Sequence, residues 1–374
     1  MNKLKLLFAD PDQTYLTSVS EYVLSSKSNE RFELKLFSTK ENLQHYITKE
    51  PEYDILVMDE QFEDGAEKEF GTNERCKVVL KSEIESCDHE NNVFKYQPLN
   101  QLLSSVLSYY YSETASFGGH AIKSSKTKVL SVYSPAGGTG KTTFSANFAR
   151  QLAMKNDSVF YLNFELLNST SLYFQSPEDE PSLQVFYYLK AKPNVFLSKL
   201  EKLKQYDPVS RVHYLDLLPR PAEMLEVTKE EIRNLITALV QTEDYDYIVI
   251  DLDSAIQELT LAGLQASNQV IWLLNNDIHS FQKTDIMLDN AGDFFGDKNV
   301  LKDKSYFVIN RFQGAFPQEF QRFNIPVRGY LPFIPEWVSM TDRDHAFHHP
   351  LYTKELLSLI EDITRNRTAG VTID

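Results

Sequence analysis

The residues of this sequence best suited to hold a phosphate lie together in one glycine-rich stretch. Residues 136–143 read Ala-Gly-Gly-Thr-Gly-Lys-Thr-Thr. The apolar run 129–133 before them predicts a buried strand, and apolar residues at every fourth position from Phe144 to Leu152 predict one face of a helix. A glycine-rich loop between strand and helix lets several backbone N–H groups and the positive helix end converge on one anion.

The residue types in this loop divide the work of binding a nucleotide. Lys141 has the reach to contact the β- and γ-phosphates, and the Thr142 hydroxyl is suited to ligate Mg²⁺. A glycine-rich turn that only caps a helix is the alternative, which the Gly-Lys-Thr tripeptide in this context disfavours. The predicted nucleotide-binding residues of the loop are Gly137, Gly138, Thr139, Gly140, Lys141, Thr142 and Thr143.

The loop departs from the common phosphate-loop pattern, because Pro135 stands where a glycine five places before Gly140 is usual. The run Gly-Gly-x-Gly-Lys-Thr-Thr instead resembles the deviant Walker A loop of the MinD/ParA family. That resemblance implies a site for ATP and Mg²⁺ in a face-to-face homodimer. In the family a lysine directly before the two glycines reaches the partner's nucleotide. Ala136 occupies that position here, so we expect weak hydrolysis or none.

Two carboxylates follow later predicted strands. The run Tyr247–Asp251 is apolar and ends in an acid, which is typical of a Walker B strand whose aspartate helps to hold Mg²⁺. At Asn163 to Glu165 the resembled family has Asp-x-Asp, whose second aspartate positions the attacking water. We therefore predict that Glu165 polarises water, with a polar strand end of no catalytic role as the alternative. The predicted catalytic residues are Lys141, Glu165 and Asp251, and the predicted metal ligands are Thr142 and Asp251.

The resemblance also implies residues around the base. Asn310-Arg311 follows an apolar run and matches an Asn-Arg pair that binds the adenine edge in the family; an amide suits this role because it both donates and accepts. An asparagine that caps a turn is the alternative. Pro332 lies in a Leu-Pro-Phe tripeptide that resembles the family's nucleotide-side loop after the last strand. We expect Asn310, Arg311 and Pro332 to contact the base.

The N-terminal part carries carboxylates of its own at predicted strand ends. Residues 1–111 alternate strand and helix signals, with Asp10 and Asp12 after the first strand and Asp59 ending the third. This layout resembles a response-regulator receiver domain, which implies a flavodoxin-like α/β fold with Asp59 as the phosphoacceptor. Gln97, before Pro98, replaces the lysine that receivers have there. We therefore predict a degenerate receiver used for docking, with phosphorylation of Asp59 as the alternative.

The sequence predicts two α/β domains and a linker. Residues 112–127 are rich in Ser, Gly and Lys and show no hydrophobic period, which indicates a linker. The expected organisation is a receiver-like domain at 1–111, the linker at 112–127, and a P-loop ATPase domain at 128–374 with a mostly parallel sheet flanked by helices. Apolar residues between Leu356 and Ile363 share one helical face, which we expect to pack on its own domain.

Composition excludes several classes of protein. The net charge of −15 and a sequence pI of about 5.1 argue against broad attraction to DNA or anionic lipid. No apolar run approaches the ~18 residues of a membrane span. Cys76 and Cys87 form no Cys-x-x-Cys pair, as expected for reduced thiols. We expect a cytoplasmic protein without DNA binding or stable membrane insertion.

The domain order gives the most specific functional expectation. A receiver-like domain followed by a MinD/ParA-type ATPase is similar to the TadZ/CpaE branch of that family. The resemblance implies an ATP-binding homodimer that acts at the cell pole as a scaffold for protein components of a Tad-type pilus or secretion assembly. Two alternatives stay open: a cycling partitioning ATPase of the ParA kind, and a two-component output protein controlled by phosphorylation of Asp59.

Overall fold

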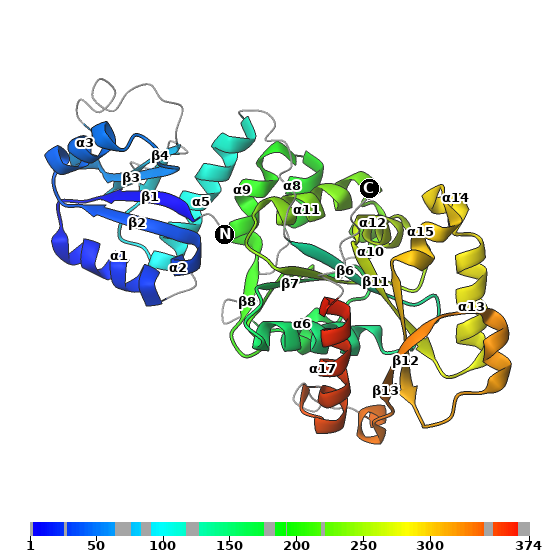
Figure 1. The fold of residues 1–374 in the computed structure, drawn as a ribbon. Helices are drawn as coiled ribbons and strands as arrows, with labels where there is room; N and C mark the ends of the chain where they lie inside the picture. The colour runs from blue at the N-terminus through cyan, green and yellow to red at the C-terminus, as the bar shows by residue number, and fades with distance from the viewer. Residues whose placement is uncertain are drawn as a thin grey trace, which may run out of the picture. The chain divides into compact units, whose positions relative to one another are not determined.

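The computed structural model describes most of the chain as two compact units (Figure 1). The first unit comprises Met1–Lys123 with Lys192–Lys202, and the second comprises Ser124–Ala191 with Leu203–Asp374. The described residues are 3–25, 28–63, 76–83, 91–116, 127–175, 184–191, 193–217, 221–339 and 347–365. Each unit is built around its own sheet and is treated separately below.

Five parallel strands form the sheet of the first unit, in the order β2-β1-β3-β4-β5. This is one of the common orders of doubly wound α/β sheets. Because the strands are parallel, their carboxyl ends meet at one edge, and the pairing of Ala9 with Met58 puts Asp10 next to Asp59. The strands are β1 (Leu4–Ala9), β2 (Phe32–Phe37), β3 (Ile55–Asp59), β4 (Cys76–Lys81) and β5 (Asn92–Phe94).

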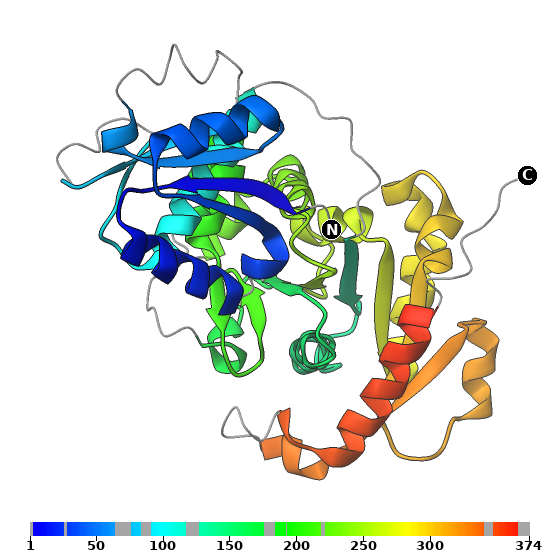
Figure 2. The same cartoon turned by 60° about the vertical axis from the view of Figure 1, so that its left-hand side comes forward.

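Helices cover both faces of this sheet (Figure 2). Leu6 and Phe8 of β1 share a hydrophobic cluster with α1 and α5, whereas Leu7 and Ala9 share a second cluster with α3. Successive side chains of a strand point to opposite faces, so a strand covered on both sides is mostly apolar, as β1 is apart from Lys5. The helical segments are α1 (Gln13–Ser25), α2 (Ser28–Arg31), α3 (Lys40–Lys49), η1 (Glu60–Phe62), α5 (Leu99–Ser116) and α9 (Pro193–Leu203).

Helix α5 extends further than the sequence analysis predicted. It runs to Ser116, so residues 112–116 are helical rather than part of a linker. The reason is local, because no glycine or proline interrupts the sequence until Gly118. Residues 117–126, the central part of the predicted linker, lie outside the described residues.

The second unit contains an eight-stranded sheet in the order β13-β12-β11-β6-β10-β7-β9-β8. Neighbouring strands are parallel except for the antiparallel pair β8 and β9, which confirms the prediction of a mostly parallel sheet. Strand β6 lies between β10 and β11, so the glycine-rich loop leaves from the middle of the sheet. The strands are β6 (Lys128–Tyr133), β7 (Val159–Asn163), β8 (Gln205–Asp207), β9 (Val212–Tyr214), β10 (Tyr247–Asp251), β11 (Gln269–Asn275), β12 (Ser305–Phe312) and β13 (Val327–Pro332).

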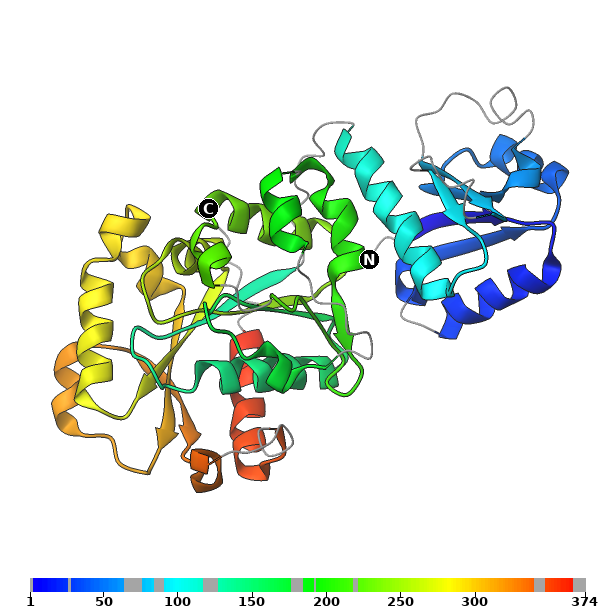
Figure 3. The same cartoon turned by 180° about the vertical axis from the view of Figure 1, so that it is seen from behind.

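Two layers of helices enclose this sheet (Figures 1 and 3). Helices α6 and α17 pack together on one side, and α8, α11 and α12 lie on the other. The helical segments are α6 (Lys141–Met154), α7 (Thr170–Tyr173), α8 (Val185–Ala191), α10 (Pro221–Leu225), α11 (Lys229–Gln241), α12 (Glu258–Ala266), α13 (Ile278–Asp289), α14 (Ala291–Phe295), α15 (Lys298–Asp303), η3 (Gln318–Phe323), η4 (Pro335–Ser339) and α17 (Pro350–Arg365).

The last helix packs on its own unit, as predicted. Leu356, Ile360 and Ile363 of α17 belong to the same hydrophobic core as Phe144 and Phe148 of α6. The apolar face of α17 is therefore covered by the core of its own unit. A bilayer-crossing helix is not found among the described residues.

Candidate functional site

The loop between β6 and α6 has the backbone that a phosphate-binding loop requires. Gly138 and Gly140 have positive φ angles of 70° and 84°, in the left-handed region that favours glycine. Gly140 is the N-cap of α6 and offers no side-chain acceptor to the first N–H groups of the helix. A Cβ added at Gly137 or Gly138 would meet no atom within 4 Å, so the space above the loop is open to a ligand.

Lys141, Thr142 and Glu165 come together at this loop. The Nζ of Lys141 lies 3.9 Å from Oε1 of Glu165, and the Thr142 hydroxyl donates to Oε2 of Glu165 at 3.1 Å. Glu165 follows β7, whereas the other two residues begin α6. The predicted water-polarising residue therefore contacts both the predicted phosphate-binding lysine and a predicted metal ligand.

Asp251 lies at the floor of the same site. In the sheet it pairs with Val132 of β6 on one side and with Asn163 of β7 on the other. Its carboxylate is fully buried and accepts hydrogen bonds from the hydroxyls of Ser145 and Tyr161, each at 3.2 Å. These two hydroxyls fix the orientation of the carboxylate beneath the loop.

The two carboxylates of the site resist ionisation together. Burial, and next the nearby Glu165 carboxylate, raise the pKa of Asp251 to about 7. Burial also raises the pKa of Glu165, against the opposing effect of Lys141. Asp251 is buried and Glu165 is partly buried, and both lie near the same lysine, so an additional cation would stabilise both in their ionised forms.

The donor set at this position fits Mg²⁺. Hydroxyl and carboxylate oxygens are the ligands this ion prefers, and Thr142 and Asp251 supply one of each beside the loop. The hydroxyl oxygen of Thr139 is buried without a hydrogen-bond partner in the described part of the chain, as expected where a ligand completes the site. Thr142 and Asp251 are the residues that would hold the ion, which neutralises phosphate charge when bound.

Asn310 contacts the phosphate loop itself. Its Nδ2 donates to the backbone oxygen of Thr139 at 2.8 Å, and a Cβ on Gly140 would lie 2.6 Å from the same nitrogen. Gly140 is thus required by this close approach as well as by its φ angle. Of the other residues predicted at the base, Arg311 is exposed with a φ of 56°, and Pro332 ends β13.

Sequence reasoning missed three side chains of this site. Ser254 accepts a hydrogen bond from Lys141, and Ser145 and Tyr161 orient Asp251. Ser254 follows β10 by three residues, and this position at the carboxyl end of a central parallel strand is a signal that could have identified it. Ser145 and Tyr161 lie inside elements with apolar neighbours, where the sequence offers no such signal.

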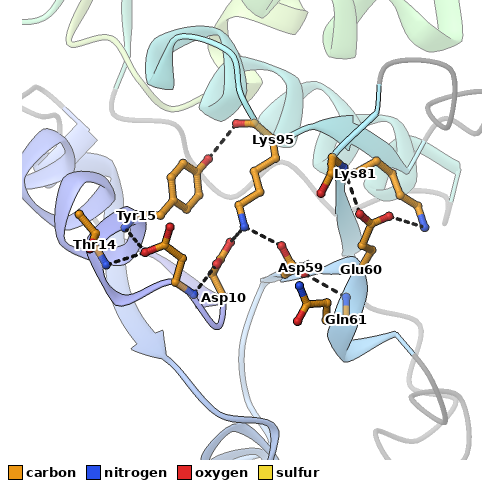
Figure 4. A network of polar contacts seen from close by, with 10 residues as sticks. Asp10, Thr14, Tyr15, Asp59, Glu60, Gln61, Lys81 and Lys95 are labelled. Carbon is orange, nitrogen blue, oxygen red and sulfur yellow. Dashed lines mark hydrogen bonds and ion pairs between the residues drawn. The ribbon is translucent and has the colours of Figure 1, made fainter.

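The first unit has a separate cluster of charged side chains (Figure 4). The Nζ of Lys95 lies 2.7 Å from a carboxylate oxygen of Asp10 and 2.7 Å from one of Asp59. All three residues are buried, and the Tyr15 ring centroid lies 5.1 Å from the same Nζ. Asp12, the other carboxylate after the first strand, accepts from the backbone N–H groups at the start of α1.

The expectation that this cluster has no lysine is wrong. Lys95 follows directly on β5, which ends at Phe94, so its side chain lies at the edge where Asp10 and Asp59 meet. Gln97, the residue on which the expectation rested, donates to the backbone oxygen of Phe94 instead. Spacing from a proline does not determine which residue follows the end of a strand. Burial lowers the pKa of Lys95, but its bonds to the two carboxylates outweigh this effect and raise the pKa above its ordinary value.

Comparisons with known proteins concern the second unit. Residues 127–294 match the family model described as AAA domain. An uncharacterized protein of Methanocaldococcus jannaschii is 25% identical over 233 residues, which cover 54% of this chain and 84% of the relative.

Among solved structures, the cell division ATPase MinD of Pyrococcus furiosus aligns with a TM-score of 0.51 at 19% identity. That alignment covers 64% of this chain and 98% of MinD. The septum site-determining protein MinD of Pyrococcus horikoshii, complexed with Mg-ADP, aligns at 17% identity with a TM-score of 0.47, over 66% of this chain and 100% of that one. The alignment with the Pyrococcus furiosus protein shows that the second unit, which contains the glycine-rich loop, shares the fold of that MinD structure.

The raised pKa of Asp251 predicts a pH dependence of stability without nucleotide. The pKa rises from 3.8 to about 7 on folding, so the folded protein binds more protons between these values and loses stability as pH rises through them. Between pH 5 and pH 8 the wild type should lose about 2 to 3 kcal/mol more than Asp251→Asn, which cannot ionise there. Urea unfolding at several pH values measures this difference. Asp253→Asn, at a partly exposed position nearby, is the control; parallel profiles for wild type and Asp251→Asn would contradict the prediction.

The cluster in the first unit predicts a large effect of removing Lys95. Lys95→Met leaves two buried carboxylates without their cation and should lower the free energy of unfolding by about 3 to 5 kcal/mol. Lys81→Met is the matched control, because Lys81 pairs with the more exposed Glu60 and Glu63 and should cost under about 1 kcal/mol. Adding Asp10→Asn and Asp59→Asn to Lys95→Met should restore part of the loss. Equal effects of the two lysine variants in denaturant unfolding would refute this account.

Proposed function

We propose that this protein binds ATP with Mg²⁺ as a homodimer and acts as a positional scaffold with weak hydrolysis or none. The observation that carries the proposal is the convergence of Lys141, Thr142, Glu165 and Asp251 on one open glycine-rich loop. A loop that only capped a helix would need neither a buried lysine nor two carboxylates beside it.

Each part of the site has a task in this proposal. The backbone from Gly137 to Gly140 holds the phosphates, and Lys141 binds the β- and γ-phosphates. Asn310 supports the loop through Thr139 and retains an amide oxygen for the adenine edge. Arg311 and Pro332 are the other residues proposed to contact the base. Glu165 is the residue available to orient water.

Weak hydrolysis follows from the residue at position 136. Phosphoryl transfer is accelerated by cationic contacts to the developing charge, and the loss of one costs orders of magnitude in rate. Ala136 is a buried methyl group whose backbone oxygen accepts from Ser254, so this position supplies no cation to a partner. ATP would then act mainly by stabilising the dimer.

Exposed apolar side chains support the proposed dimer. Leu167 and Leu172 follow β7 with exposed fractions of 76% and 65%, and Ile256 follows β10 with 48%. Strands β7 and β10 are parallel neighbours, so these residues follow the carboxyl ends of strands on the same edge as the phosphate loop. We propose that a second copy covers them when nucleotide is bound.

The cellular role is proposed from the order of the domains. We propose a cytoplasmic protein located at a cell pole, where it gathers protein components of a Tad-type pilus or secretion assembly, with the first unit as a receiver-like docking domain. The net charge of −15 supports protein partners over DNA.

The proposal predicts nucleotide that stays bound rather than turning over. Purified wild-type protein should retain ATP or ADP and release phosphate far below the ~1 to 100 per second of ordinary kinases. Lys141→Ala should lose the retained nucleotide, whereas Lys155→Ala, exposed at the opposite end of α6, should keep it. Nucleotide content and phosphate release are measured on all three proteins. A wild type that binds no nucleotide would contradict the whole proposal. Turnover at kinase rates would contradict only the claim of weak hydrolysis or none.

The position of Lys95 favours a second candidate function, control by phosphorylation of Asp59. An acyl phosphate on this aspartate needs a cation beside it, and the Lys95 ammonium is 2.7 Å from the carboxylate. If this function holds, acetyl phosphate with Mg²⁺ should add one phosphoryl group to the wild type and to Asp54→Asn, but not to Asp59→Asn. Mass spectrometry detects the adduct; its absence from the wild type would favour the docking role.

A further inference from the structure

The Ser254 hydroxyl connects three segments of the nucleotide site. Its Oγ accepts a hydrogen bond from Nζ of Lys141 at 2.8 Å and donates to the backbone oxygen of Ala136 at 3.1 Å. Lys141 begins α6, Ala136 lies in the first half of the phosphate loop, and Ser254 follows β10. A single side chain thus spans the loop from one end to the other.

The direction of both bonds is determined by the groups themselves. An ammonium can only donate and a carbonyl oxygen can only accept, so Ser254 must accept from Lys141 and give its own proton to Ala136. Each bond strengthens the other, because a hydroxyl that donates becomes a better acceptor. The arrangement leaves two N–H donors of Lys141 for other partners.

Holding Lys141 in this way reduces the cost of binding a phosphate. A lysine side chain has a flexible four-carbon stem, and ordering it on binding costs conformational entropy. A lysine already fixed above the loop has lost much of this freedom before the ligand arrives, so more of its interaction appears as affinity.

We infer that Ser254 is a positioning residue that orients Lys141 for the β- and γ-phosphates of the bound nucleotide. The inference rests on the proposed nucleotide site and adds to it a residue from outside the phosphate loop. Ser254 acts through Lys141, so its contribution should be present with Lys141 and disappear without it.

Ser134 offers a matched comparison. Its Oγ accepts from the backbone N–H of Ala136 at 3.3 Å, so Ser134 and Ser254 hold opposite sides of the same residue. Ser254 bonds to Lys141, whereas the bond of Ser134 supports Ala136 alone. A role confined to supporting the loop would make the two serines equivalent.

The test compares affinities for Mg-ATP by competition with a fluorescent ATP analogue, using the full chain. Ser254→Ala should weaken binding about tenfold, the effect of losing one hydrogen bond to a charged group. Ser254→Thr, which keeps the hydroxyl, should stay within about threefold of the wild type, as should Ser134→Ala. In the Lys141→Ala background, Ser254→Ala should cause no further loss, because the two residues act as one unit.

Several outcomes would overturn the inference. Equal losses in Ser254→Ala and Ser134→Ala, or an undiminished loss in the Lys141→Ala background, would reduce Ser254 to support of the loop; the proposed function would stand, since the wild type still binds nucleotide. A wild type that binds no nucleotide would end both. If Ser254→Ala does not fold, Ser254→Val against Ser254→Thr makes the same comparison with near-equal shapes, and equal affinities of that pair would reject the inference.

Discussion

The register of the central parallel strands is the constraint on which the candidate nucleotide site depends. Val132, Asp251 and Asn163 are paired side by side across β6, β10 and β7. Parallel strands in register deliver all their following segments to one edge. Three segments therefore lie close together at that edge: the phosphate loop, the loop with Ser254 and the segment with Glu165. A slip of one residue in β10 would turn Asp251 to the opposite face of the sheet.

The chemistry of the site follows from a shortage of positive charge at that edge. Lys141 faces Glu165 directly, and Asp251 lies buried beneath them. Burial is the main cause of the raised pKa values of the two acids, and the nearby Lys141 offsets it only in part. This arrangement supports the proposal that Mg²⁺ binds here together with a nucleotide. The segments after β7 and β10, where apolar side chains are exposed, leave the sheet at the same edge.

The first unit also contains a cluster of two carboxylates and one lysine. Its parallel strands bring Asp10 and Asp59 together, and Lys95 supplies the cation between them. Both clusters contain two carboxylates and one lysine, but Lys95 lies 2.7 Å from an oxygen of each of its carboxylates, whereas Lys141 lies 3.9 Å from Glu165. A buried ion pair with both partners present is tolerated, whereas one with a partner removed is strongly destabilising. This difference explains why one cluster is a candidate for docking or regulated modification and the other for ligand binding.

The sequence by itself determined the elements that carry their signals locally. Glycines at 137, 138 and 140 before Lys141, an apolar strand that ends in Asp251, and the apolar face of α17 were all readable from type and spacing. What only the tertiary structure decided is which side chains from separate strands meet. Lys95 lies beside Asp59, although Gln97 occupies the position where a lysine was expected. Ser254 accepts a hydrogen bond from Lys141, and Asn310 donates one to the phosphate loop. These contacts join residues 36 to 171 positions apart, and the register of strands, rather than any local pattern, sets such distances.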